Sequence, residues 1–155
     1  MPQTPPVIQE KRLIPVQQQL QRFRVNILLV DDDYLLAKGT AKLIQRMGGH
    51  HVSITDNPVE IFKQCESGDV DIVLMDVNLP GASWEGQEVS GADLSRILKT
   101  QPSTSHIPII IVTAYAMLTE RQTLLSISHA NDFCTKPITD YEALLELIAQ
   151  LTKKA

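Results

Sequence analysis

The chain contains little cysteine and few aromatic residues, and it has no long apolar stretch. Phenylalanine, tryptophan and tyrosine make up 5% of the 155 residues, and the two cysteines are Cys65 and Cys134. Two isolated cysteines are typical of reduced, packed thiols rather than of a disulfide framework. No apolar run approaches the roughly 20 residues that a membrane-spanning helix needs. The start, Met1–Pro6, lacks the charged and apolar regions of a secretion signal, so we expect a cytoplasmic protein without a membrane anchor.

The chain is also poor in positive charge. Its net charge is -4 at pH 7, and no basic stretch is dense enough to follow a nucleic-acid backbone. We therefore expect no direct binding to nucleic acid. With 155 residues, 43% of them hydrophobic, the chain can bury the core of one small domain.

Short apolar runs typical of strands alternate with amphipathic segments typical of helices. This alternation predicts an α/β fold with a parallel sheet. Gly48-Gly49 should end the first helix, and Asn57 followed by Pro58 should begin the second. Capping boxes at Thr119 and Thr139 should begin the last two helices. The expected strands are 26–30, 51–55, 71–75, 109–112 and 132–134, and the first three helices should cover about 34–47, 58–66 and 92–99.

Polar residues follow the apolar runs at the point where each run ends. Asp31–Asp33 follow the first run, Asp76 follows the third and Thr113 follows the fourth, while a weaker fifth run leads to Lys136. In an open parallel sheet the carboxyl ends of the strands share one edge, and ligands bind in the crevice outside it. The sequence therefore predicts that these distant residues meet in one pocket.

The charge of this pocket indicates what it can hold. Two unit charges about 5 Å apart repel by roughly 3 kcal/mol at an effective dielectric near 20, so Asp31, Asp32 and Asp76 need a cation among them. Lys136 supplies one positive charge. The oxygen-only set of ligands fits a hard divalent ion such as Mg2+. We therefore expect Mg2+ as the cofactor and phosphate chemistry at this edge.

Four segments together carry a resemblance to one family. They are the acidic cluster after the first strand, Met75–Gly81, Val112–Tyr115 and Thr135–Pro137. Each is a weak signal alone, but four in the right order, each at a predicted strand end, are specific. From about Val25 to Leu151 the chain resembles the receiver domain of a two-component response regulator of the chemotaxis-regulator type. The resemblance implies a flavodoxin-like, doubly wound sheet of five parallel strands, in the order 2-1-3-4-5, with five helices.

The resemblance also implies a role for each polar residue. Asp76 would accept a phosphoryl group from a phosphohistidine on a sensor histidine kinase or a histidine phosphotransfer protein. Asp32 would bind Mg2+ directly and Asp31 largely through water, with Asp76 and the backbone carbonyl of Asn78 as further ligands. Lys136 would pair with a phosphoryl oxygen, and its bond to the following proline should be cis. Such a protein catalyses only its own phosphorylation and slow dephosphorylation, so it is a switch rather than an enzyme.

A receiver of this kind would pass its state to other proteins. The hydroxyl of Thr113 would donate to a phosphoryl oxygen, and Phe133 would rotate into the space that Thr113 leaves. The fourth helix, fifth strand and fifth helix would form the surface for a downstream protein target. We expect a stand-alone receiver that could form a homodimer. Tyr115 and Asn78 occupy positions that tune dephosphorylation in members of the family. Phe133 could also be an ordinary core residue.

Two other functions stay open. Asp31 and Asp33 are spaced like the acid pair of haloacid-dehalogenase-like phosphatases, in which Asp31 would be the nucleophile. Leu35 stands where those enzymes prefer threonine or valine, and Asp33 could simply cap the first helix. The other alternative is a pseudo-receiver, an interaction module that is never phosphorylated. The histidines have no metal-ligand spacing, and we interpret all of them as surface or loop residues: His50, His51, His106 and His129.

Two segments depart from the family pattern. Residues 81–90 make the loop after Asp76 roughly seven residues longer than usual. That polar loop could shield the acyl phosphate, contribute to the choice of kinase or be a tolerated insertion. Residues 1–24 form an N-terminal extension before the receiver domain, which we place at 25–155. The extension is either a flexible tail or an arm that docks on this domain or on a second copy through Leu13, Ile14, Val16, Leu20 and Phe23.

Overall fold

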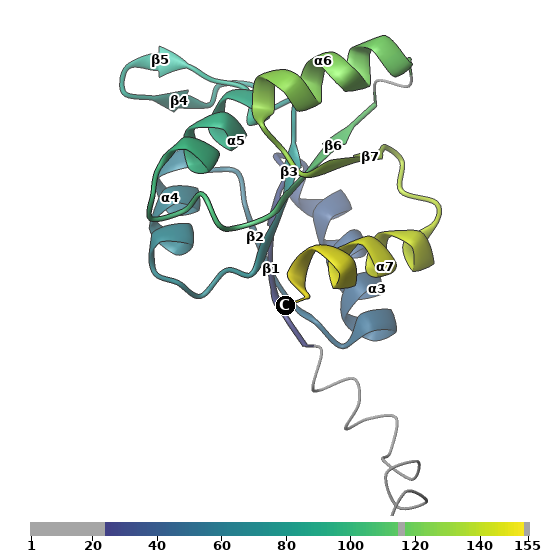
Figure 1. Ribbon diagram of the computed structural model, residues 1–155. Helices are drawn as coiled ribbons and strands as arrows, with labels where there is room; N and C mark the ends of the chain where they lie inside the picture. The colour runs from purple at the N-terminus through teal and green to yellow at the C-terminus, as the bar shows by residue number, and fades with distance from the viewer. Residues whose placement is uncertain (1–23, 115–116, 154–155) are drawn as a thin grey trace, which may run out of the picture.

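A parallel sheet of five strands forms the centre of the molecule (Figure 1). The computed structural model describes residues 24–114 and 117–153, so Tyr115 and all of the predicted extension except Arg24 lie outside the described residues. The strand order is β2-β1-β3-β6-β7, which is the predicted order 2-1-3-4-5. The elements are β1 (Asn26–Val30), α3 (Tyr34–Gly48), β2 (His51–Thr55), α4 (Pro58–Glu66), β3 (Ile72–Asp76), β4 (Ser83–Trp84), β5 (Gln87–Glu88), α5 (Gly91–Thr100), β6 (Ile109–Thr113), α6 (Leu118–Ser128), β7 (Asp132–Thr135) and α7 (Tyr141–Thr152).

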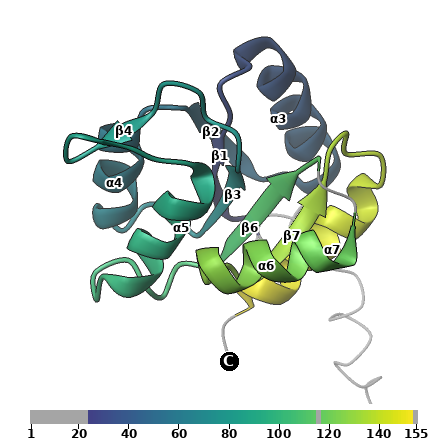
Figure 2. The same ribbon diagram turned by 90° about the horizontal axis from the view of Figure 1, so that it is seen from above.

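The central strands are apolar throughout because both of their faces are covered. In β1, Leu28 and Val30 face the core under α4 and α5, whereas Ile27 and Leu29 face the core under α3 and α7. Figure 2 shows these pairs of helices on opposite sides of the sheet, with α6 beside α5 and β7. Successive side chains of a strand point to opposite faces, so a strand buried on both sides has no polar alternation. Within the described residues, none of the helices has the length and apolar content to cross a membrane.

Several predicted helix ends are confirmed. Gly49 ends α3 in the left-handed conformation with a φ of 71°, where the missing Cβ removes the steric cost. The Asn57 side chain accepts a hydrogen bond from the Val59 N–H at 2.9 Å at the start of α4. Asp33 accepts a hydrogen bond from the Leu36 N–H at 3.1 Å and so caps α3.

The capping boxes predicted at Thr119 and Thr139 are wrong. Helix α6 begins one residue before Thr119, and its start has no side-chain cap. Helix α7 is capped by Asp140, which accepts a hydrogen bond from the Ala143 N–H at 3.0 Å. A carboxylate next to Thr139 takes the cap because it accepts a stronger, charge-assisted bond than a hydroxyl does. A capping box joins Ser90 to Asp93 at the start of α5, where none was predicted.

The loop after Asp76 is more ordered than the sequence indicates. Strands β4 and β5 pair as an antiparallel hairpin whose turn residues, Glu85 and Gly86, have φ values of 52° and 79°. Two residues with positive φ are typical of the tight turn that joins two such strands. Trp84 packs on Phe62 of α4 with ring centroids 4.1 Å apart. The insertion is therefore a hairpin fixed to the domain.

His50 lies in the loop between α3 and β2, which agrees with its interpretation as a surface or loop residue. His50 is buried, and its Nδ1 accepts a hydrogen bond from the Val25 N–H at 3.2 Å. Burial lowers the pKa of its imidazole, which keeps Nδ1 available as an acceptor. The other three histidines are exposed.

Candidate functional site

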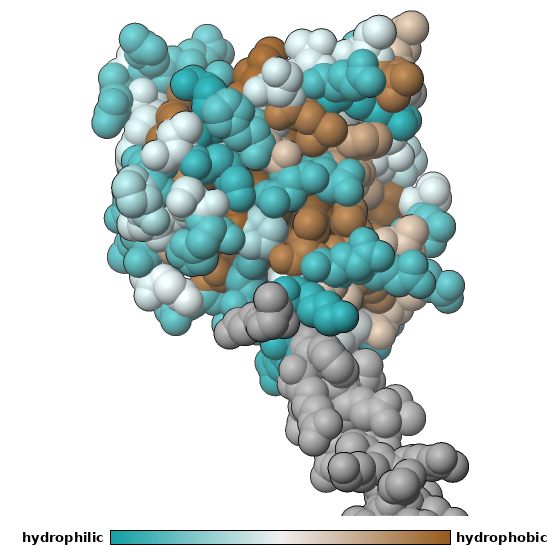
Figure 3. All heavy atoms as spheres, in the orientation of Figure 1, coloured by the Kyte–Doolittle hydropathy of each residue, from teal (hydrophilic) through white to brown (hydrophobic). Residues whose placement is uncertain are grey.

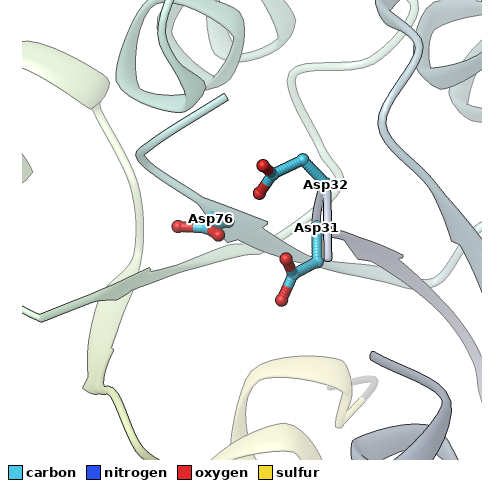
Figure 4. A group of neighbouring side chains, drawn as sticks. All are labelled: Asp31, Asp32 and Asp76. Atoms are coloured by element: carbon cyan, nitrogen blue, oxygen red, sulfur yellow. The ribbon is translucent and has the colours of Figure 1, made fainter. Parts of the chain in front are cut away.

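Three carboxylates meet at the carboxyl edge of the sheet (Figure 4). Asp31 and Asp32 directly follow β1, and Asp76 is the last residue of the neighbouring strand β3. One oxygen of each carboxylate lies within 4.8 Å of the others. Asp31 and Asp76 are each only 6% exposed, whereas Asp32 is exposed. The predicted convergence of these three residues is therefore observed.

Lys136 lies against two of the three acids. It follows β7 at the edge of the sheet, and its Nζ donates to Asp76 Oδ2 at 2.8 Å and to Asp31 Oδ2 at 3.1 Å. Its backbone N–H donates to the carbonyl of Thr113 at 2.8 Å, and the Lys136-Pro137 bond is cis. Lys136 is thus held by contacts of its ammonium group with Asp31 and Asp76 and of its backbone with the last residue of β6.

Backbone groups hold the buried carboxylates in place. The Asn78 N–H donates to Asp76 Oδ1 at 3.2 Å, and the Asp33 N–H donates to Asp31 Oδ1 at 2.9 Å. Each acid therefore receives one backbone hydrogen bond and one bond from the ammonium of Lys136. Buried charges need such partners to remain ionised.

The opposing effects of burial and charge set the pKa values of this site. Burial raises the pKa of Asp76, and the hydrogen bond and charge of Lys136 only partly oppose this effect. Burial alone would lower the pKa of Lys136, but its contacts with Asp76 and Asp31 outweigh burial and raise it. The lysine therefore stays positively charged, and the site favours any further positive charge near Asp76.

The predicted switch residues lie on the same side of the sheet. Thr113 ends β6, is almost fully buried and pairs with Thr135 in the sheet register. Phe133 lies two residues before Thr135 in β7. It is half-buried and packs on the core under α4 and α5. The guanidinium carbon of Arg121 lies 4.7 Å from the centre of the Phe133 ring. This contact could not be predicted from the sequence, since Arg121 has an ordinary position in a polar helix.

Gly91 is a further residue that shapes the site. A Cβ atom at this position would overlap the backbone carbonyl of Asp76. The N–H of Gly91 also donates to the carbonyl of Val77 at 2.9 Å. The start of α5 can approach the end of β3 only because residue 91 has no side chain.

The acidic cluster fits a divalent cation. Its donors are carboxylate oxygens, which hard ions such as Mg2+ prefer. Asp32 is exposed and lines a groove between the start of α4 and residues 79–83, so water can reach the cluster. A small ion that keeps several of its waters would suit such a half-open site.

Comparison with known proteins identifies the family. The family model of the response regulator receiver domain matches residues 27–149. The chain belongs to the response regulator receiver domain family. It is similar to the uncharacterized transcriptional regulatory protein YkoG of Bacillus subtilis (strain 168), with 36% identity over 81% of this chain and 50% of that protein. The chain spans only 6% to 50% of the length of the first three curated relatives that it matches.

Solved receiver structures share the fold. A putative response regulator from Chloroflexus aurantiacus has a TM-score of 0.69 and 25% identity, covering 84% of this chain and 99% of that one. The receiver domain of the sensor histidine kinase PA1611 from Pseudomonas aeruginosa has a TM-score of 0.67 and 24% identity, covering 83% and 98%. That domain was crystallised with a magnesium ion coordinated in its active-site cleft. The predicted flavodoxin-like receiver fold is confirmed.

Proposed function

We propose that this receiver accepts a phosphoryl group on Asp76 from a phosphohistidine and then changes its contacts with other proteins. The observation that carries the proposal is the contact of Lys136 with Asp76, 2.8 Å long, beside two further carboxylates. Asp76 and Asp31 are both buried and paired with the ammonium group of Lys136, and the shorter of the two bonds is the one to Asp76. This ammonium group can follow the charge onto a phosphoryl oxygen. The proposed donor is a sensor histidine kinase or a histidine phosphotransfer protein.

The transfer itself can be described with the residues of the chain. A carboxylate oxygen of Asp76 forms a bond to phosphorus while the P–N bond of the phosphohistidine breaks, and its electron pair returns to the imidazole nitrogen. The Nζ of Lys136 then pairs with a phosphoryl oxygen, which compensates part of the charge that the carboxylate receives. The Asn78 N–H keeps the other carboxylate oxygen, Oδ1, in place.

The cofactor that fits this site is Mg2+. We propose that Asp31, Asp32, Asp76 and the backbone carbonyl of Asn78 hold it. When bound, it supplies positive charge that offsets the repulsion between the carboxylates and the incoming phosphoryl group. The magnesium ion in the PA1611 receiver domain supports this assignment.

The response to phosphorylation is proposed to begin at Thr113. Its hydroxyl would donate to a phosphoryl oxygen, and Phe133 would then rotate toward the space that the threonine vacates. Helix α6, strand β7 and helix α7 would present the changed surface to a downstream protein. Only a few kcal/mol should separate the two states, since both must be populated.

We further propose a cytoplasmic switch that acts through protein contacts and does not bind nucleic acid. The receiver domain would cover residues 25–155. It would catalyse only its own phosphorylation and slow dephosphorylation, and it could dimerise. The phosphatase alternative is less well supported because Asp33, the second acid of its pair, already uses its carboxylate to cap α3.

The test compares the wild type with Asp76→Asn and Asp31→Asn after incubation with Mg2+ and acetyl phosphate. Phos-tag electrophoresis should show a retarded band for the wild type and none for Asp76→Asn. A retarded band that persists in Asp76→Asn but disappears in Asp31→Asn would favour the phosphatase. If a phosphorylated histidine phosphotransfer protein and acetyl phosphate both fail with the wild type, the chain is a pseudo-receiver.

A further inference from the structure

Apolar side chains remain exposed where α3 lies against α7. Leu43 and Met47 of α3 are 41% and 43% exposed. They lie on the same side of the helix as Thr40, which accepts a hydrogen bond from the Tyr141 hydroxyl of α7 at 3.4 Å. Tyr141 and Leu145 of α7 are only half-buried. We call Leu43, Met47, Tyr141 and Leu145 the α3–α7 surface.

Single exposed apolar side chains are common on proteins, but these four belong to two helices in contact. Figure 3 shows that apolar side chains also reach the surface on the side of the molecule where α7 and β7 lie. The exposed acids Glu142 and Glu146 of α7 are close in sequence to this surface. The exposed basic residues Lys42 and Arg46 of α3 are equally close in sequence to it, so the main requirement for a segment that covers this surface is an apolar face.

The α3–α7 surface lies close to the point where the chain enters the sheet. The Val25 N–H donates to His50 Nδ1 at 3.2 Å. A Cβ atom on Gly48, the last residue of α3, would meet the side chains of both His50 and Leu145. Figure 1 shows the start of β1 at the same end of the molecule as the end of α3. Residues just before Arg24 are thus attached next to the α3–α7 surface.

The sequence before Arg24 has the composition that this surface calls for. Its apolar residues recur at intervals of three and four, which would place them on one face of a helix: Leu13, Val16, Leu20 and Phe23. The basic residues Lys11, Arg12 and Arg22 accompany a single acid, Glu10, in contrast to the acids of α7.

We propose that residues 13–23 dock on the α3–α7 surface of their own chain. The apolar residues of the segment would cover Leu43 and Met47, and its one basic residue, Arg22, would lie near the acids of α7. Attachment at Val25 favours the same chain over a second copy, because a short tether gives an effective concentration in the millimolar range. The extension would then be part of the receiver's folded surface, beside the helix that follows Asp31–Asp33.

Amide hydrogen exchange of the full chain tests this proposal. Leu20→Glu should speed exchange in residues 43–48 and 141–147 about fivefold, because an uncovered surface opens more often. Gln18→Glu adds the same charge on the opposite face of the segment and should leave exchange unchanged. Equal exchange in the wild type and Leu20→Glu would overturn the proposal.

A variant on the folded domain gives an independent test. Met47→Glu should speed tryptic cleavage after Arg22 about fivefold. Met117→Glu is the matched control, because Met117 is 65% exposed and precedes α6. Cleavage after Arg22 at the same rate in all three proteins would contradict docking. A dimer by light scattering that Leu20→Glu converts to a monomer would assign the surface to a second copy and refute docking within one chain.

Discussion

Within residues 24–114 and 117–153, Lys136 carries the only ammonium group that lies among the acids of the site. Replacing Lys136 by methionine removes this group. At 2.8 and 3.1 Å, each attraction amounts to about 5 to 6 kcal/mol before desolvation at an effective dielectric of 20. The side chain of Lys136 is 24% exposed, while those of Asp31 and Asp76 are 6% and 8% exposed. The two ion pairs of Lys136 are therefore intermediate in strength between surface ion pairs and buried ion pairs. We expect Lys136→Met to lower the free energy of unfolding by about 2 kcal/mol at neutral pH without divalent cations.

The loss should depend on pH in a defined direction. The pKa of Asp76 is raised by burial even with the lysine present, and without the lysine it should rise further. A carboxyl group whose folded pKa exceeds its unfolded pKa destabilises the fold above the folded pKa, and this effect disappears as the pH falls through that value. The difference between the wild type and Lys136→Met should therefore shrink as the solution is acidified. Mg2+ should also reduce it, because a bound cation replaces the missing charge.

Urea unfolding of the wild type, Lys136→Met and the exposed-lysine control Lys42→Met measures this effect. The series should be run at several pH values between about 4 and 8, where carboxyl groups change their charge, with and without Mg2+. The control should match the wild type throughout. Equal stability of Lys136→Met and the wild type at neutral pH, or a loss that neither acid nor Mg2+ reduces, would refute the electrostatic account of the site.

Three other predictions concern Gly91, the hairpin turn at Glu85 and the two cysteines. Gly91→Ala should lower the unfolding free energy by at least about 2 kcal/mol and weaken beryllofluoride binding, because a Cβ would displace the Asp76 carbonyl. An unchanged midpoint of urea unfolding and an unchanged affinity for beryllofluoride would contradict this. Glu85→Asn should raise the unfolding free energy by about 0.5 kcal/mol, since asparagine tolerates a positive φ better than glutamate does; a lower urea midpoint would count against the turn assignment. Burial raises the pKa of Cys65 to about 12 and also raises that of Cys134. Iodoacetamide should therefore label the folded protein slowly, and only at Cys134, as peptide mapping can check; rapid labelling of Cys65 would show that its helix opens.

The sheet could be predicted from the sequence because its strands are short apolar runs with clear ends. Each run is buried on both faces, so its composition alone distinguishes it from the amphipathic helices. The hairpin at 83–88 could not be predicted in this way. Its strands have two residues each and are mostly exposed, and the packing of Trp84 on Phe62 links residues of two different elements. The start of α6 was misplaced for a similar reason, since no side chain caps it.

The meeting of Asp31, Asp32, Asp76 and Lys136 followed from one topological rule, that parallel strands share their carboxyl edge. The sequence did not reveal that Lys136 would already bind two of the acids, because this contact depends on how far a flexible side chain reaches. Nor did it reveal the burial of His50, which depends on the approach of Val25 from a neighbouring element. Contacts of this kind arise only once the elements are packed.

The measurement that tests the central claim most directly is the position of the phosphorylated residue. The protein is incubated with Mg2+ and a phosphorylated histidine phosphotransfer protein, and the acyl phosphate is reduced with borohydride, which converts the modified aspartate to homoserine. Tandem mass spectrometry of the peptides should then find homoserine at position 76 and nowhere else. Homoserine at position 31 or 32, with Asp76 unmodified, would contradict the account.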